Sequence, residues 1–138
     1  MRAVRVHDGQ VAVDDVPTVD GSGVRVRVRS AGICGSDLHL IEAGVVEAAQ
    51  VTLGHEVAGL TDDGTPVAIE PLAPCGTCGP CRGGEYNLCR ASDAMIFGIG
   101  RDGGMADDMW VPARALVPLP AGVDVRDASL VEPLAVVV

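Results

Sequence analysis

Alternating apolar and polar residues along this chain predict a protein made mostly of strands. Residues 24–29 read Val-Arg-Val-Arg-Val-Arg, which is the alternation of a strand with one buried and one solvated face. Residues 2–6 and 10–16 are rich in valine and flank Asp8-Gly9, which favours a hairpin turn. The same criteria predict further strands at 51–60, 65–70, 95–99, 105–112 and 115–118.

Helical signals are short and few. Ser36 is positioned to cap a short helix over residues 35–43, which Gly44 ends. A second helix is expected to begin within 124–128. Short strands separated by glycine and proline are typical of a small barrel or sandwich. The predicted fold class is therefore mostly β with short helices, in one domain over residues 1–138.

Composition limits the partners of this chain. With 138 residues, of which 48% are hydrophobic, it can bury one ordinary core but not two large domains. The net charge is −9 and the sequence has no lysine, so it offers no basic stripe for nucleic acid. No apolar run approaches the roughly 20 residues that cross a bilayer, and residues 1–10 lack the apolar region of a signal peptide. We expect a cytoplasmic protein without a membrane or nucleic-acid partner.

Four cysteines follow one another closely in the spacing Cys75-x2-Cys78-x2-Cys81-x7-Cys89. Glycines and a proline between them supply the tight turns that bring four sulfurs around one ion, so the pattern predicts a zinc-binding lobe at about 73–92. Four protein ligands leave no vacant position, which indicates a structural site.

Two alternatives to zinc remain for these cysteines. A disulfide framework requires an oxidising compartment, and the total of five cysteines is an odd number. An iron–sulfur cluster shares the C-x2-C-x2-C start, but the fourth cysteine comes seven residues later and no proline follows it. Zinc is favoured over both.

A second group of potential ligands lies outside the cysteine-rich segment. Cys34, followed by Ser36, Asp37 and His39, and the pair His55-Glu56 offer a thiolate, an imidazole and carboxylates to a metal. A lone cysteine is more often a small buried apolar residue, and a lone histidine is more often structural. Their combination with the four-cysteine pattern favours a second metal site.

Five ordered segments of the chain form a pattern together, and they are residues 31–39, 54–59, 75–89, 103–107 and 131–135. In this pattern the chain resembles the zinc-dependent medium-chain alcohol and polyol dehydrogenases, in the branch of sorbitol and threonine dehydrogenases. The resemblance implies the catalytic domain of such an enzyme, a GroES-like barrel with one catalytic and one structural zinc. It implies Cys34, His55 and Glu132 as catalytic ligands, with Glu56 as a fourth or exchanging ligand.

The same resemblance implies roles for the residues that surround this metal. Zinc would help an alcohol lose its proton near neutral pH, after which hydride passes to NAD or NADP. Ser36 would contact the alcohol oxygen and pass its proton through the nicotinamide ribose toward His39. Asp37 would orient the ligand histidine. The alternative for Ser36 and Asp37 is a pair of helix-capping residues. A small alcohol or polyol is the implied substrate, and a homo-oligomer is expected for the full-length form.

Three departures from the family pattern stand out. Residues 60–66 make an abrupt turn where the family has a longer excursion, and residues 42–53 are brief and lack a proline common before the His-Glu pair. In the family, the segment like residues 132–135 leads into a Rossmann domain. A strand followed by a glycine-rich phosphate turn is absent from this sequence, so we expect 124–138 to be the start of the connection to a missing nucleotide-binding domain.

Residues 98–104 match the letters G-x-G-x-x-G, but no βαβ pattern surrounds them, so we do not interpret them as a cofactor site. The isolated chain is therefore expected neither to bind NAD(P) nor to oxidise alcohols. Two alternatives remain: a freestanding zinc-binding GroES-like module without redox activity, and a weaker one, a zinc hydrolase with Glu56 as its general base.

Overall fold

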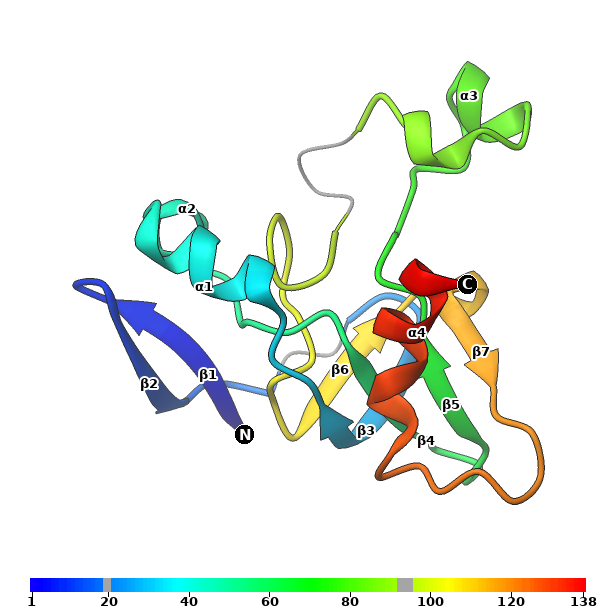
Figure 1. Ribbon diagram of the computed structural model, residues 1–138, viewed down its shortest axis with the longest axis horizontal. Helices are drawn as coiled ribbons and strands as arrows, with labels where there is room; N and C mark the ends of the chain where they lie inside the picture. Colours follow the sequence, from blue (N-terminus) through cyan, green and yellow to red (C-terminus); the bar gives the residue numbers. More distant parts are fainter. Residues whose placement is uncertain (19–20, 92–95) are drawn as a thin grey trace.

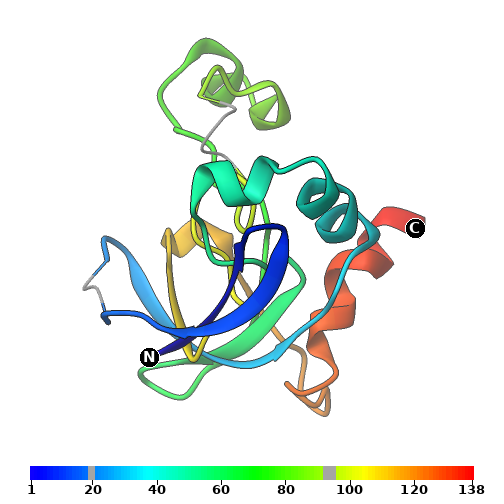
Figure 2. The ribbon, with the colours of Figure 1, turned by 90° about the vertical axis from the view of Figure 1, so that its left-hand side faces the viewer.

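The chain forms a curled antiparallel sheet, a separate hairpin and a small lobe that stands away from both (Figure 1, Figure 2). The structure is a computed structural model, and it describes residues 1–18, 21–91 and 96–138. The strands are β1 (Arg2–His7), β2 (Gln10–Asp15), β3 (Val24–Ala31), β4 (Val57–Thr61), β5 (Pro66–Ile69), β6 (Asp108–Val111) and β7 (Leu116–Pro118). The α-helices are α1 (Gly35–Glu42), α2 (Val45–Ala49), α3 (Gly79–Arg82) and α4 (Val131–Val137), and the 3-10 helices are η1 (Tyr86–Leu88), η3 (Ala113–Ala115) and η4 (Ala128–Leu130).

The five-stranded sheet has the order β6-β3-β4-β5-β7, and every pairing in it is antiparallel. In β3 the predicted alternation is confirmed: Val26 is fully buried, while the Arg25 guanidinium lies 2.8 Å from the carboxylate of Asp108 on β6. The core of the sheet consists of Val26, Val57, Val67, Ile69, Ala73, Phe97, Met109, Val111 and Ala115. Burial of these apolar side chains, from the strands and from the segments packed beside them, holds the sheet together.

The hairpin β1–β2 turns at Asp8 and Gly9, which both have positive φ values. The carboxylate of Glu47 on α2 accepts the backbone N–H groups of Asp8, at 2.6 Å, and of Gly9, at 3.0 Å. A second apolar cluster connects the hairpin, α2 and the segment before β4, through Val6, Val46, Val51 and Leu53. The helices α1 and α2 thereby lie beside the hairpin (Figure 1).

Several boundaries differ from the sequence prediction. Of the strand expected at 51–60 only Val57–Thr61 is regular, because residues before it bond to two separate segments rather than to a strand ladder. The helix expected from 124 begins at Ala128 as η4, after turns. Within the strand expected at 95–99, residue 95 lies outside the described residues, and residues 96–97 form only isolated bridges. The α2 helix was not predicted, since its five residues are too few for a periodic signal.

The mostly β prediction is confirmed, with strands at each of the other predicted positions. In the described part of the chain, no helix is long and apolar enough to cross a membrane.

Candidate metal centres

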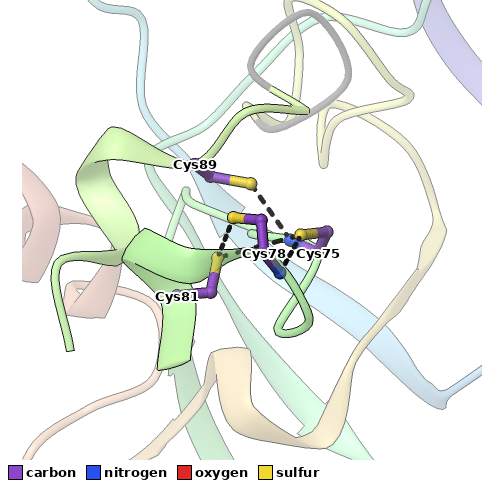
Figure 3. A group of neighbouring side chains, drawn as sticks. All are labelled: Cys75, Cys78, Cys81 and Cys89. Atoms are coloured by element: carbon purple, nitrogen blue, oxygen red, sulfur yellow. Dashed lines mark hydrogen bonds between the residues drawn. The ribbon is translucent and has the colours of Figure 1, made fainter. Parts of the chain in front are cut away.

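Four sulfur atoms meet in the lobe that α3 and η1 form. The Sγ atoms of Cys75, Cys78, Cys81 and Cys89 all lie within 4.8 Å of one another and point toward a common centre (Figure 3). A tetrahedral zinc site with Zn–S bonds of about 2.3 Å places its sulfurs about 3.8 Å apart. The sulfurs of Cys75 and Cys81 are 3.8 Å apart, and those of Cys78 and Cys81 are 3.3 Å apart. This geometry fits a four-thiolate metal site.

Local backbone groups favour the thiolate form at part of this cluster. The N–H and hydroxyl groups of Thr77, followed by Cys78, lower the pKa of Cys75 to about 5. Burial and the neighbouring Cys78 sulfur raise the pKa of Cys81 to about 12. Cys81 therefore keeps its proton at neutral pH without a cation, and a divalent metal ion would offset the repulsion that four thiolates at this spacing would feel. All five cysteines are free, so the disulfide alternative is wrong for this structure.

The second group combines two segments that are distant in sequence. Cys34 is the N-cap residue of α1, and His55 and Glu56 directly precede β4. Their ligand atoms all lie within 4.8 Å of one another, and His55 and Glu56 are each only 7% exposed. The predicted convergence of these three residues is therefore present in the structure. A thiolate, an imidazole and a carboxylate form a donor set that suits zinc and leaves room for another ligand.

Asp37 connects the two halves of this group. Its side chain is 2% exposed, and its Oδ2 accepts the Cys34 N–H at 2.9 Å. Its Oδ1 lies 3.4 Å from His55 Nδ1, which is an ion-pair distance rather than that of a short hydrogen bond. Neither of these two atoms has another hydrogen-bond partner among the described residues. Because a carboxylate only accepts, the proton of a neutral His55 belongs on Nδ1, which leaves Nε2 free to bind a metal.

Electrostatics at this site reflect the same contacts. The interaction with Asp37 raises the pKa of His55 to about 9, although burial opposes the shift, and Cys34 contributes to it. Burial alone would raise the pKa of Asp37, but its contact with the His55 ring and the bond that it accepts from the Cys34 N–H hold it below its usual value. Bonds from Ser36 lower the pKa of the Cys34 thiol. The metal-free site is thus an array of charged groups that favours a thiolate.

Ser36 and His39 lie on the same helix, with different surroundings. The Ser36 hydroxyl is 3.3 Å from His55 Nε2, on the ring edge that faces away from Asp37. His39 is exposed in the last turn of α1. The prediction that Ser36 caps α1 is wrong: Cys34 occupies the N-cap, and Asp37 bonds its N–H. The hydroxyl of Ser36 is therefore available to the site.

Glu132 is not part of this group. It is half-buried in the first turn of α4, and α4 packs against β5 and η4. Among the described residues, the ligand atoms gathered with Cys34 and His55 include the carboxylate of Glu56 and not that of Glu132. A ligand role for Glu132 stays a prediction.

Sequence reasoning missed one residue at this site. The Gly32 N–H donates to the Glu56 carbonyl oxygen at 2.8 Å, and a Cβ atom at Gly32 would overlap the Glu56 carboxylate. Gly32 therefore makes room for this ligand. The only signal in the sequence was a small residue two positions before Cys34.

Comparison with known proteins agrees with this geometry. Residues 20–121 match the model of the alcohol dehydrogenase GroES-like domain. Sorbitol dehydrogenase of Halalkalibacterium halodurans is 38% identical over 140 aligned residues, which cover 92% of this chain and 40% of that protein. The chain therefore belongs to the zinc-dependent medium-chain alcohol and polyol dehydrogenase family, and corresponds to its N-terminal GroES-like domain.

Solved structures give the same result. Galactitol-1-phosphate dehydrogenase from Escherichia coli superposes with a TM-score of 0.84 and 35% identity, over 99% of this chain and 43% of that chain. An alcohol dehydrogenase from Escherichia coli CFT073, in complex with NADH, superposes with a TM-score of 0.82 and 30% identity, again over 99% and 43%. The predicted GroES-like fold is confirmed, and the chain spans less than half the length of these relatives.

Proposed function

We propose that this chain is the catalytic domain of a zinc- and NAD(P)-dependent dehydrogenase that acts on a small alcohol or polyol. The observation that carries the proposal is the convergence of Cys34, His55 and Glu56, with Asp37 behind the histidine and Ser36 in front of it. Three protein ligands leave one coordination position for a substrate oxygen, with the Ser36 hydroxyl beside it, whereas a purely structural site is closed by four protein ligands. The names of the relatives, which are sorbitol and galactitol-1-phosphate dehydrogenases, support the substrate class.

Cys34, His55 and Glu56 would hold the catalytic zinc, and the four cysteines of the lobe would hold the structural one. Zinc in the first site would supply Lewis-acid chemistry, which eases the loss of a proton from a bound alcohol. The lobe site has four thiol ligands and no position for substrate. The chemistry is therefore assigned to the first site alone.

The residues of the chain perform defined tasks in this proposal. Asp37 holds the His55 ring by its Nδ1 edge and keeps the Cys34 backbone in place, so that the ligands are oriented before substrate binds. Ser36 accepts the substrate proton at its hydroxyl oxygen and releases its own. His39 lies three residues further along α1, on the same face of the helix, and is exposed to receive that proton. The cofactor ring would be held by a nucleotide-binding domain.

The proposal is tested by joining the chain to the nucleotide-binding domain of the galactitol-1-phosphate dehydrogenase of Escherichia coli. The formation of NADH or NADPH is then measured with a panel of polyols and secondary alcohols. We expect zinc-dependent turnover, and Ser36→Ala should lower kcat by about 10²- to 10⁴-fold with a smaller change in KM. The matched control is Ser22→Ala, at an exposed serine distant in sequence from the ligands. Equal kinetics for the two variants would remove Ser36 from the mechanism.

A further inference from the structure

The glycine-rich segment 98–104, which has no role in the function proposed above, packs against the backbone that leads to the metal ligands. The Gly103 N–H donates to the Thr52 carbonyl at 2.8 Å, and the Gly104 N–H donates to the Gly54 carbonyl at 2.9 Å. The next residue, Met105, donates its N–H to the Leu53 carbonyl at 2.8 Å. Three consecutive bonds therefore fix the segment that ends one residue before His55.

Glycine is required here by close approach of one backbone to another. A Cβ atom at Gly103 would overlap the carbonyl oxygen of Gly54 and would lie 2.6 Å from that of Leu53. A Cβ atom at Gly98 would lie 2.7 Å from the Gly54 nitrogen. Because backbone atoms are held by their own hydrogen bonds, they cannot move aside as a flexible side chain does.

Side-chain contacts fix the same segment. The carboxylate of Asp102 accepts the Thr52 N–H at 2.8 Å, and the guanidinium of Arg5 lies 3.8 Å from that carboxylate. The hairpin adds a backbone bond, because the Leu53 N–H donates to the Val4 carbonyl at 3.0 Å. Thr52 is only 2% exposed, whereas the side chain of Asp102 is 66% exposed, so the Asp102 carboxylate is the group that holds the buried Thr52 N–H at the surface.

Gly54 connects this fixed backbone to the two ligand residues. It has a φ of +98°, and it is followed at once by His55 and Glu56. Every residue from 51 to 59 is buried, so a displacement of Gly54 cannot be absorbed by a flexible surface turn. Its position therefore sets where both ligands start.

We propose that residues 98–104 form a rigid backbone platform whose purpose is to position His55 and Glu56 for the metal, with Gly103 and Asp102 as positioning residues. The proposal rests on the metal site assigned in the proposed function. A glycine motif that resembles a phosphate-binding turn in its letters thus serves the metal instead. In the structure this segment leads to strand β6 and not to a helix, in keeping with a role other than phosphate binding.

The test is a Co²⁺ titration of the 138-residue chain, followed by the visible absorption of thiolate-bound Co²⁺. A Cys34→Ser variant defines the spectrum of the lobe site alone. We expect Gly103→Ala to weaken Co²⁺ binding at the Cys34–His55 site by about 10- to 100-fold and to change its spectrum, as disturbing the groups that orient a metal ligand usually does. Binding at the lobe site should stay unchanged in the same sample, and cooperative thermal unfolding, followed by the fluorescence of Trp110 on β6, should show that the sheet of the variant is folded.

Gly23→Ala is the matched control. A Cβ atom at Gly23 would overlap the carbonyl oxygen of Val111, so it causes a comparable backbone clash between β3 and β6, and its φ of +119° adds strain. It should lower thermal stability at least as much as Gly103→Ala, yet leave Co²⁺ affinity and spectrum intact. Equal Co²⁺ affinities at the Cys34–His55 site for the two variants would overturn the proposal that residues 98–104 position the ligands. If the unmodified chain binds Co²⁺ only at the lobe, the proposed function itself fails.

A milder variant covers the case in which Gly103→Ala does not fold. Asp102→Ala removes the acceptor of the Thr52 N–H without adding atoms, and Asp102→Asn keeps an oxygen acceptor there. We expect weaker Co²⁺ binding at the Cys34–His55 site for the alanine variant and recovery for the asparagine variant. Unchanged binding in Asp102→Ala would contradict the proposal.

Discussion

The two candidate metal centres are built in opposite ways. The lobe takes all its ligands from one continuous segment, residues 75–89, and much of it is exposed. The Cys34–His55–Glu56 site takes its ligands from two distant segments, and its backbone is fixed by the hairpin and by residues 98–105. A closed site can therefore be specified by local spacing and turns, whereas an open site for chemistry requires tertiary structure to hold its ligands in place.

Loss of a lobe ligand should have the largest effect. In Cys81→Ser we expect the loss of one of the two zinc ions and opening of residues 75–89, because the binding energy of a structural metal is folding energy. Hydrogen exchange should rise throughout the lobe, and should stay slow in β3 and β4. The matched variant Asn87→Ser, at an exposed position in η1, should change neither the zinc content nor the hydrogen exchange of the lobe. Unchanged exchange in Cys81→Ser would contradict a structural role for the lobe metal.

Replacement of His55 tests the buried site through its effect on the stability of the sheet. His55→Ala leaves the buried carboxylate of Asp37 without its ion-pair partner. Removal of one partner of a buried pair lowers the free energy of unfolding by about 3–5 kcal/mol. Urea unfolding followed by the fluorescence of Trp110, the single tryptophan, measures the change. The control is His7→Ala, which breaks an exposed pair with Asp14 and should cost about 0–1 kcal/mol. Equal losses of unfolding free energy in the two variants would show that the buried pair with Asp37 stabilises the fold no more than an exposed pair does.

Replacement of Asp37 by asparagine should give a smaller and more selective change. Asp37→Asn retains an oxygen for the Cys34 N–H and removes the negative charge beside His55. We expect zinc affinity at this site to fall by about 10- to 100-fold, with the lobe unaffected. Competition with a chromophoric chelator, which resolves the two sites, would measure it. A loss shared by both sites would contradict their independence.

The smallest effect is expected for the replacement of Glu56 or Glu132, which should change zinc binding to different extents. Glu56 lies in the ligand group and Glu132 does not, so Glu56→Gln should weaken zinc binding more than Glu132→Gln. Isothermal titration of zinc into each metal-free variant gives the comparison. A greater loss in Glu132→Gln would show that the resemblance, and not the observed grouping, identifies the ligand.

Particular elements show what the sequence could predict. The alternation in residues 24–29 and the Asp8-Gly9 turn were sufficient for β3 and for the first hairpin, because both signals are local. Spacing alone predicted the four-cysteine cluster. By contrast, residues 51–56 have the apolar character of a strand and yet bond to two separate segments, which only the folded chain brings together.

The open site was predicted mainly through the resemblance to a family. Cys34 and His55 are separated by twenty residues that carry two helices, and no local pattern places them together. The contacts of Gly32 with Glu56, and of Gly103 with Gly54, depend on backbone approach between distant segments. Such contacts carry no periodic or spacing signal, so physical reasoning on the sequence could not find them.

We propose that this chain holds two separate zinc ions, one in each ligand group. A crystal of the zinc-loaded chain, measured with X-rays just above and just below the zinc absorption edge, tests it most directly. We expect two anomalous peaks, one among the four lobe sulfurs and one within reach of Cys34 Sγ, His55 Nε2 and the Glu56 carboxylate. A peak in the lobe with none beside Cys34, from crystals grown with excess zinc, would contradict it.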